Sequence, residues 1–201
     1  MSTDACDPRW SAYADYTRLR NAGLRKDALA AATDCARQIV DAGAQGDFTR
    51  WLFGEIVRPR IPLTPVLPHQ LREIALPALW DAHADGQSWA TKALIDWFPA
   101  EVMAAYDYCT DAVRVMLTRA LAEHPGDVVL SALLARHLLT WVRHDIADLA
   151  RGRYDGDPRE DLARLAEARG LIGADDPMGG EIEQVRAVVE HWIAAGQRPS
   201  S

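Results

Sequence analysis

The sequence is poor in cysteine and has no long apolar run. Its three cysteines, Cys6, Cys35 and Cys109, lie far apart and form no CxxC motif, so no disulfide framework is expected. Residues 1–4 are polar and acidic, which does not fit a signal peptide. No apolar run approaches the ~20 residues that a membrane-spanning helix needs. We therefore predict a reduced, cytoplasmic protein with free thiols and no membrane association.

Lysine is also rare, because Lys26 and Lys92 are lysines and all other basic residues are arginines. Together with the many alanines, this bias is typical of a GC-rich bacterial genome. The formal net charge is −7. Proteins that bind nucleic acids generally carry a basic face, so we expect no nucleic-acid partner.

The common catalytic and phosphate-binding motifs are missing. The sequence has no GxSxG, P-loop or HExxH motif and no glycine-rich dinucleotide-binding turn. Their absence argues against the commonest enzyme classes and leaves a helical enzyme as an alternative. We expect no cofactor.

Apolar residues recur at helical spacing along most of the chain. This pattern predicts an all-α protein of about nine helices in antiparallel hairpins, forming an irregular bundle or a short α-solenoid. The length of 201 residues fits a single domain, with residues 1–6 and 196–201 frayed. The predicted helices are 7–21, 25–41, 47–56, 68–83, 88–98, 99–123, 127–151, 158–171 and 181–195.

Proline interrupts this pattern in one segment. Pro59, Pro62, Pro65 and Pro68 fall at every third residue. Each proline removes a backbone donor and disfavours the helical conformation of the residue before it. We predict an extended connector over residues 58–68.

Two short segments share the spacing of small and apolar residues found in tetratricopeptide units. These positions are Leu19, Gly23, Ala28, Ala32 and Cys35 in the first segment, and Leu117, Ala120, Pro125, Gly126 and Asp127 in the second. Over about a third of its length the chain resembles a degenerate tetratricopeptide-like (TPR-like) helical-repeat protein, although no period of about 34 residues is sustained. The resemblance implies a concave surface that holds a peptide or protein, and no catalytic chemistry.

One carboxylate falls on the apolar stripe of the predicted helix 127–151. At about 100° per residue, the apolar side chains centre between Leu138 and Asp145, so Asp145 lies on the buried face beside Trp141. An unpaired buried carboxylate is unfavourable, so we expect an arginine, a tyrosine hydroxyl or exposed helix N–H groups as its partner. Asp145 is then either a structural tie between helices or a site carboxylate with a shifted pKa.

Three polar side chains, those of His137, His144 and Asp148, border the same stripe. His144 and Asp148 lie one turn apart and are candidate metal ligands. His137 lies two turns from His144, so a complete metal site would need a second helix. Alternatively, the three residues are hydrogen-bonded to neighbouring helices or water.

The helices 99–123 and 127–151 are joined by a short turn, which favours an antiparallel pair. A cleft between them would be lined by Tyr106, His137, Trp141, His144 and Asp145. Such a cleft would suit a small polar ligand, with Asp145, His144 and Tyr106 as candidate catalytic groups. Alternatively, its aromatic residues serve as packing with one hydrogen-bonding end.

The sequence contains seven tryptophans. Trp89 and Trp97 share one face of a predicted helix, while Leu94 and Phe98 occupy an adjacent face. A helix with two apolar faces packs against two neighbours or leaves one face for a partner. The candidate partner-binding residues are Trp89, Trp97, Trp141 and His137.

Two functions are consistent with these features. The first is a non-enzymatic module that binds a protein or peptide, such as an adaptor or a small immunity-type protein, and a homodimer is one form it could take. The second is a helical enzyme, or a binder of a metal or small ligand, with its site between helices 99–123 and 127–151. The missing catalytic motifs, the abundant aromatic residues and the repeat resemblance favour the first function.

Overall fold

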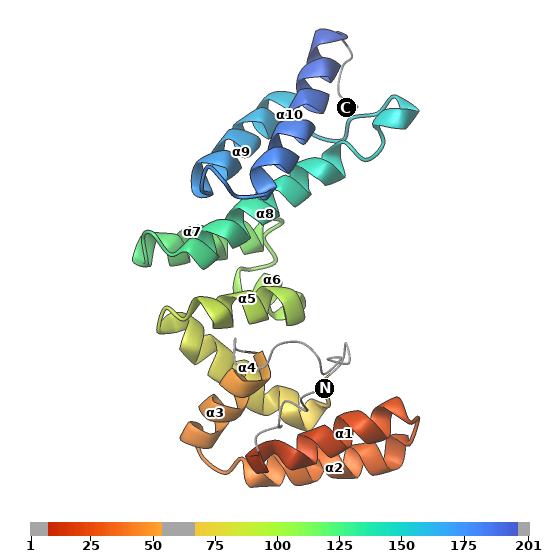
Figure 1. Cartoon of the computed structure of the whole chain (residues 1–201), viewed down its shortest axis with the longest axis vertical. Helices are drawn as coiled ribbons and strands as arrows, with labels where there is room; N and C mark the ends of the chain where they lie inside the picture. Colours follow the sequence, from red (N-terminus) through yellow and green to blue (C-terminus); the bar gives the residue numbers. More distant parts are fainter. Residues whose placement is uncertain (1–7, 54–66, 197–201) are drawn as a thin grey trace. The chain divides into compact units, whose positions relative to one another are not determined.

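The computed structural model describes residues 8–53 and 67–196, and these residues form an all-α protein (Figure 1). No strand occurs within these two ranges. The prediction of an all-α fold is therefore confirmed. The α-helices are α1 (Ser11–Asn21), α2 (Arg25–Gln38), α3 (Ala42–Phe53), α4 (His69–Ala84), α5 (Ser88–Trp97), α6 (Pro99–Ala105), α7 (Ala112–Glu123), α8 (Val128–Asp145), α9 (Pro158–Leu171) and α10 (Met178–Ala194), with short 3-10 helices η1 (Pro8–Trp10) and η2 (Leu149–Arg151).

The contacts divide the chain into two compact units, Met1–Glu101 and Val102–Ser201. The first unit contains α1 to α5, and the second contains α7 to α10. The prediction of a single domain stays a prediction, and the two units are described separately below.

Aromatic side chains fill the core of the first unit. Helices α1 and α2 form a hairpin that turns at Gly23, whose φ of 78° suits glycine. Phe48 of α3 is fully buried, with its ring centroid 5.2 Å from that of Trp10 and 5.9 Å from that of Tyr13. Trp51 completes this cluster, 5.5 Å from Tyr13.

The boundary between α2 and α3 differs from the prediction. Asp47 was expected to cap the third helix, but α3 begins five residues earlier, at Ala42. The side chain of Asp41 accepts a hydrogen bond from the backbone N–H of Ala44 at 2.8 Å, so Asp41 satisfies a free N–H group of the first turn. Asp47 instead lies inside α3 and pairs with Arg9.

One proline of the first unit lies within a helix. Pro77 lies inside α4, which is continuous from His69 to Ala84. The extended connector predicted over 58–68 falls mainly outside the described residues, because 54–66 are not among them.

The predicted helix 99–123 is wrong, because the chain breaks between α6 and α7. Asp107 and Tyr108 have φ values of 53° and 55°, in the left-handed region, and the Tyr108 N–H donates to the Met103 carbonyl at 2.8 Å. The segment 106–111 is poor in strong helix formers, so local propensity does not oppose the break. Cys109, which the sequence placed on the apolar stripe, is exposed as a result.

Helices α8 and α9 begin where the sequence predicts. Asp127 accepts hydrogen bonds from the N–H groups of Val129 and Leu130, and Asp157 caps α9 in the same way. Helix α8 was predicted to reach about Arg151, but it ends at Asp145.

Helix α10 packs against α9 and, to a smaller extent, against α8 (Figure 1). Its buried side includes Ile182, Val185, Val189 and Trp192, which follow the predicted helical spacing. Among the described residues, no helix has the length and apolar character that crossing a membrane requires.

Candidate functional site

The second unit presents a polar and aromatic surface built from α7, α8 and α9. We call it the Trp141 face and define it by Asp111, Arg114, His137, Trp141, Arg164 and Glu167. Trp141 is partly exposed on α8. The His137 ring meets it edge-on at a centroid distance of 6.1 Å, and the Arg164 guanidinium carbon lies 5.5 Å from the centroid of the indole. Trp141 is therefore held between an imidazole and a cation.

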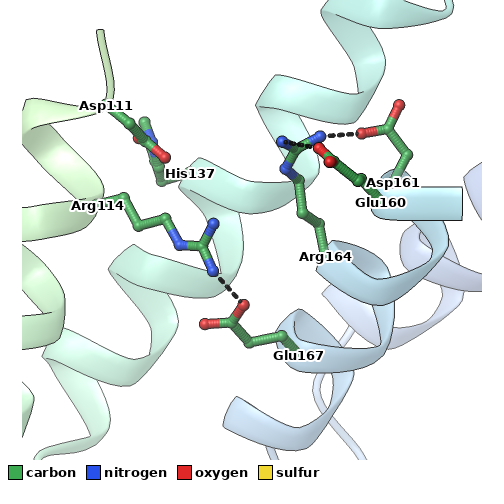
Figure 2. A network of polar contacts seen from close by, with 7 residues as sticks. All are labelled: Asp111, Arg114, His137, Glu160, Asp161, Arg164 and Glu167. Carbon is green, nitrogen blue, oxygen red and sulfur yellow. Dashed lines mark hydrogen bonds and ion pairs between the residues drawn. The ribbon is translucent and has the colours of Figure 1, made fainter. Parts of the chain in front are cut away.

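Polar contacts tie the three helices of the Trp141 face together (Figure 2). His137 Nε2 lies 2.7 Å from Asp111 Oδ1, which links α8 to α7. Arg114 Nη2 lies 2.8 Å from Glu167 Oε2, which links α7 to α9. The His137 and Asp111 side chains are about one-quarter exposed, whereas Arg114 and Glu167 are 36% and 38% exposed, so solvent screens the second pair more.

Arg164 connects the Trp141 face to the interior. Its Nη1 lies 2.5 Å from Asp161 Oδ1 and its Nη2 lies 3.2 Å from Glu160 Oε2, as Figure 2 shows. Asp161 is completely buried, and the side chain of Arg164 is 19% exposed. Asp161 therefore fixes the position of the guanidinium group that lies against Trp141.

The buried partner of Asp145 is a second carboxyl group. Asp145 is buried at the end of α8, as its place on the apolar stripe predicts, and the Asp161 carboxyl group lies close enough to act on it electrostatically. We call Asp145 and Asp161 the buried acid pair. Burial raises the pKa of Asp145, the neighbouring Asp161 raises it further, and Arg164 opposes both effects.

Tyr154 completes the surroundings of the buried acid pair. Its side chain is fully buried, and its hydroxyl donates a hydrogen bond to Asp161 Oδ2 at 2.7 Å. Burial and this hydrogen bond both raise the pKa of the Tyr154 hydroxyl, so Tyr154 stays a donor. Its ring lies 5.9 Å from that of Trp192 on α10.

Gly156 leaves the space that the Asp145 carboxyl occupies. A Cβ atom at position 156 would lie 2.3 Å from Asp145 Oδ2 and 2.8 Å from Asp145 Cγ. The backbone N–H of Asp155 donates to the Asp145 carbonyl at 3.0 Å. The segment 146–157 therefore closes over Asp145 through both backbone and side-chain contacts.

The structure does not bring the predicted cleft residues together. His144 is exposed, whereas Asp145 faces the interior. Tyr106 lies beyond the end of α6, where burial raises its pKa and Arg119 and Glu123 are its charged neighbours. Of the five predicted residues, His137 and Trp141 are in direct contact.

The candidate metal ligands are separated by the end of α8. His144 lies in its last turn, whereas Asp148 lies beyond it and pairs with Arg151 at 2.9 Å and Arg153 at 3.9 Å. Within 8–53 and 67–196, no group of three or more His, Cys, Asp or Glu side chains is arranged to hold a metal ion.

Trp89 and Trp97 lie in the first unit and are partly buried. The Trp97 ring packs 6.0 Å from Phe53 of α3. The indole N–H of Trp89 is buried without a hydrogen-bond partner among the described residues. These contacts account for Trp97 by packing.

A groove of about 460 Å³ lies between η2 and α10 in the second unit. Its lining residues are Leu149, Ala187, Val188, His191, Trp192 and Ala195. The Trp192 side chain is 7% exposed, and its indole N–H has no hydrogen-bond partner among the described residues. The groove is thus largely apolar.

Sequence reasoning missed Asp161, Tyr154 and Arg164. A signal for Asp161 was present, because Asp161, Leu165 and Ala168 share one face of α9 at helical spacing and all three are buried. Arg164 follows Asp161 by three residues on the same helix, which is the spacing of an ion pair, whereas Tyr154 lies in the loop before α9 and carries no such signal.

Comparison with known proteins identifies no relative: no family model, no curated protein and no solved structure matches this chain.

Proposed function

We propose that the chain is a non-enzymatic protein- or peptide-binding module and that the Trp141 face is its contact surface. The observation that carries this proposal is the partly exposed Trp141, held between His137 and Arg164. Tryptophan and arginine are enriched among the residues that dominate binding energy at protein interfaces.

Preorganisation of this face supports the proposal. Asp111, Arg114 and Glu167 form ion pairs that fix α7, α8 and α9 around Trp141. A surface whose side chains are already ordered loses less conformational entropy when a partner binds. The expected partner places an apolar or aromatic side chain on Trp141 and polar groups against the flanking charges.

The position of Asp145 favours binding over catalysis. Asp145 is buried, and its partner Asp161 is completely buried. A general acid or base must come within hydrogen-bonding reach of its substrate. The buried acid pair fits better as a structural tie between α8 and α9. We also propose that the helical hairpins are TPR-like. The biological role proposed for the module is that of an adaptor or an immunity-type protein.

The test is affinity purification from the native host, followed by mass spectrometry, with wild-type protein and two variants. Trp141→Ala removes the proposed anchor, while Val128→Ala removes a 78% exposed apolar side chain from the same helix. We expect a partner retained by wild type and Val128→Ala whose affinity for Trp141→Ala falls by roughly 30-fold, which corresponds to about 2 kcal/mol.

Circular dichroism first establishes that both variants are folded. A partner that Trp141→Ala retains as well as wild type does would refute the Trp141 face as the contact surface. Native mass spectrometry of the same samples distinguishes a foreign partner from a second copy of the chain.

A second candidate function rests on the groove beside α10. Its volume of about 460 Å³ falls within the range of small-ligand sites, and its largely apolar lining suits an apolar ligand. Ala187→Leu would fill the groove, and Ala194→Leu makes the same change outside its lining. A small molecule that co-purifies with the wild-type protein should be lost from Ala187→Leu and retained by Ala194→Leu. Its equal retention by both variants would exclude the groove.

A further inference from the structure

The segment 146–157 is held in place mainly around the buried acid pair. Asp155 donates its backbone N–H to the Asp145 carbonyl, and Tyr154 donates its hydroxyl to Asp161. Gly156 lies directly against the Asp145 carboxyl. Tyr154 therefore contacts the Asp161 carboxyl, Gly156 contacts the Asp145 carboxyl, and Asp155 contacts the Asp145 backbone.

The positive charge near Asp145 is too small to balance the negative charges of both Asp145 and Asp161. From α9, Asp161 and Arg164 face it, and from α8 itself His144 acts on it. Arg164 is also engaged with Glu160 and Trp141, so its positive charge is shared.

The remaining neighbours add no positive charge to the pair. From the segment, the Tyr154 hydroxyl faces Asp161, and Asp157 adds negative charge near Tyr154. From α10, the uncharged Trp192 packs against Tyr154, while Glu181 pairs with Arg143 at the surface of α8. Two adjacent buried carboxylates with one shared arginine are unfavourable, which favours the protonated form of Asp145.

We propose that the buried acid pair is a proton-controlled latch: the protonated Asp145 donates to Asp161 and keeps segment 146–157 docked, and loss of this proton releases the segment. The latch goes beyond the proposed binding function and requires no partner. Leu149 belongs to this segment and forms one wall of the groove beside α10, so release also opens the groove.

The direction of the pH effect follows from the raised pKa of Asp145. The docked state holds the proton more tightly than the released state does, so its stabilisation is fully present below the ordinary aspartate pKa of about 4. The stabilisation is lost as the pH rises from there through the raised pKa of Asp145. The docked state of segment 146–157 therefore becomes less stable as the pH rises through the raised pKa of Asp145. Above that pKa its stability no longer changes with pH.

Hydrogen exchange followed by mass spectrometry between about pH 4 and about pH 8 tests the latch on the full chain. After correction for the intrinsic exchange rate, protection of amides 146–157 should fall with rising pH. The total fall should be about tenfold for each unit by which the Asp145 pKa is raised. Asp145→Asn should abolish this dependence, because an amide donates to Asp161 without titrating.

Asp148→Asn is the matched control, since Asp148 lies in the same segment but pairs with Arg151 and Arg153. This variant should keep the pH dependence of wild type. Constant protection in wild type, or the same dependence in Asp145→Asn, would overturn the proposal.

Infrared spectroscopy of wild type is a second test that does not depend on the folding of a variant. A protonated carboxylic acid should give a carbonyl stretching band that persists above the titration range of ordinary aspartates, and Asp145 is its proposed source. A spectrum without such a band would also overturn the latch.

Discussion

The two compact units differ in what fills their interiors. The first unit packs Phe48, Trp51 and Tyr13 ring against ring. The second unit buries an acid pair, Asp145 and Asp161, beneath an arginine-stacked tryptophan. Burial of apolar surface is enough to explain why the aromatic residues of the first unit are inside. Burial of two carboxyl groups lowers stability, so their presence in the second unit needs another explanation. The difference directs the search for function to the second unit.

The largest expected effect is in the aromatic core. Phe48→Ala leaves a cavity among Trp10, Tyr13 and Trp51, so the free energy of unfolding should fall by about 3–5 kcal/mol. Urea titration measures this loss. Leu29→Ala, at a 52% exposed position of α2, should cost about 0.5 kcal/mol or less. Similar costs for the two variants would contradict an aromatic core.

The buried acid pair should give the next largest effect. Asp161→Ala leaves the Tyr154 hydroxyl without its acceptor and Arg164 without its buried partner, which should cost about 2–4 kcal/mol in urea unfolding. Glu160→Ala removes the more exposed partner of Arg164 and should cost about 0.5 kcal/mol. A neutral Asp161→Ala would contradict a stabilising role for its contacts with Tyr154 and Arg164.

A glycine pair tests how closely the segment 146–157 covers Asp145. Gly156→Ala places a methyl group against the Asp145 carboxyl, so the protein should lose about 1–3 kcal/mol. Gly170→Ala in α9 has open space and should gain up to about 1 kcal/mol, because alanine favours helix. Melting temperatures should shift in opposite directions. A gain at both positions would show that the Asp145 carboxyl does not occupy this space.

The smallest effect concerns the surface ion pair between α7 and α9. The coupling energy of Arg114 and Glu167 should be about 0.5 kcal/mol in a double-mutant cycle of Arg114→Gln and Glu167→Gln, and added salt should reduce it. A coupling energy as large as the cost expected for Asp161→Ala would contradict the distinction between a weak surface pair and strong buried contacts.

Local signals in the sequence predicted most helix positions. The spacing of apolar residues identified the helices, and the caps Asp127 and Asp157 identified where α8 and α9 begin. Cap signals act over two or three residues, so a single sequence contains them in full. They were misleading at α3, where Asp41 and Asp47 are both acceptable caps and Asp41 is the one used.

Helix ends without a strong local signal were not predictable. The apolar stripe continues through 106–111 in the sequence, although the chain leaves the helix there with two residues at positive φ. Helix α8 likewise ends at Asp145 without a proline or glycine to stop it. After α8, the following segment folds back onto Asp145 and Asp161, and such contacts are invisible to helical periodicity.

The sequence by itself determined that this chain is all-α and that Asp145 is buried, because helix formation and amphipathicity depend on residues three or four positions apart. The tertiary structure decided that Asp161 is the partner of Asp145, that Tyr154 and Arg164 satisfy Asp161, and that Trp141 remains partly exposed. Asp145 and Tyr154 lie outside α9, so it is the packing of α9 on α8 and on the following segment that brings them to Asp161.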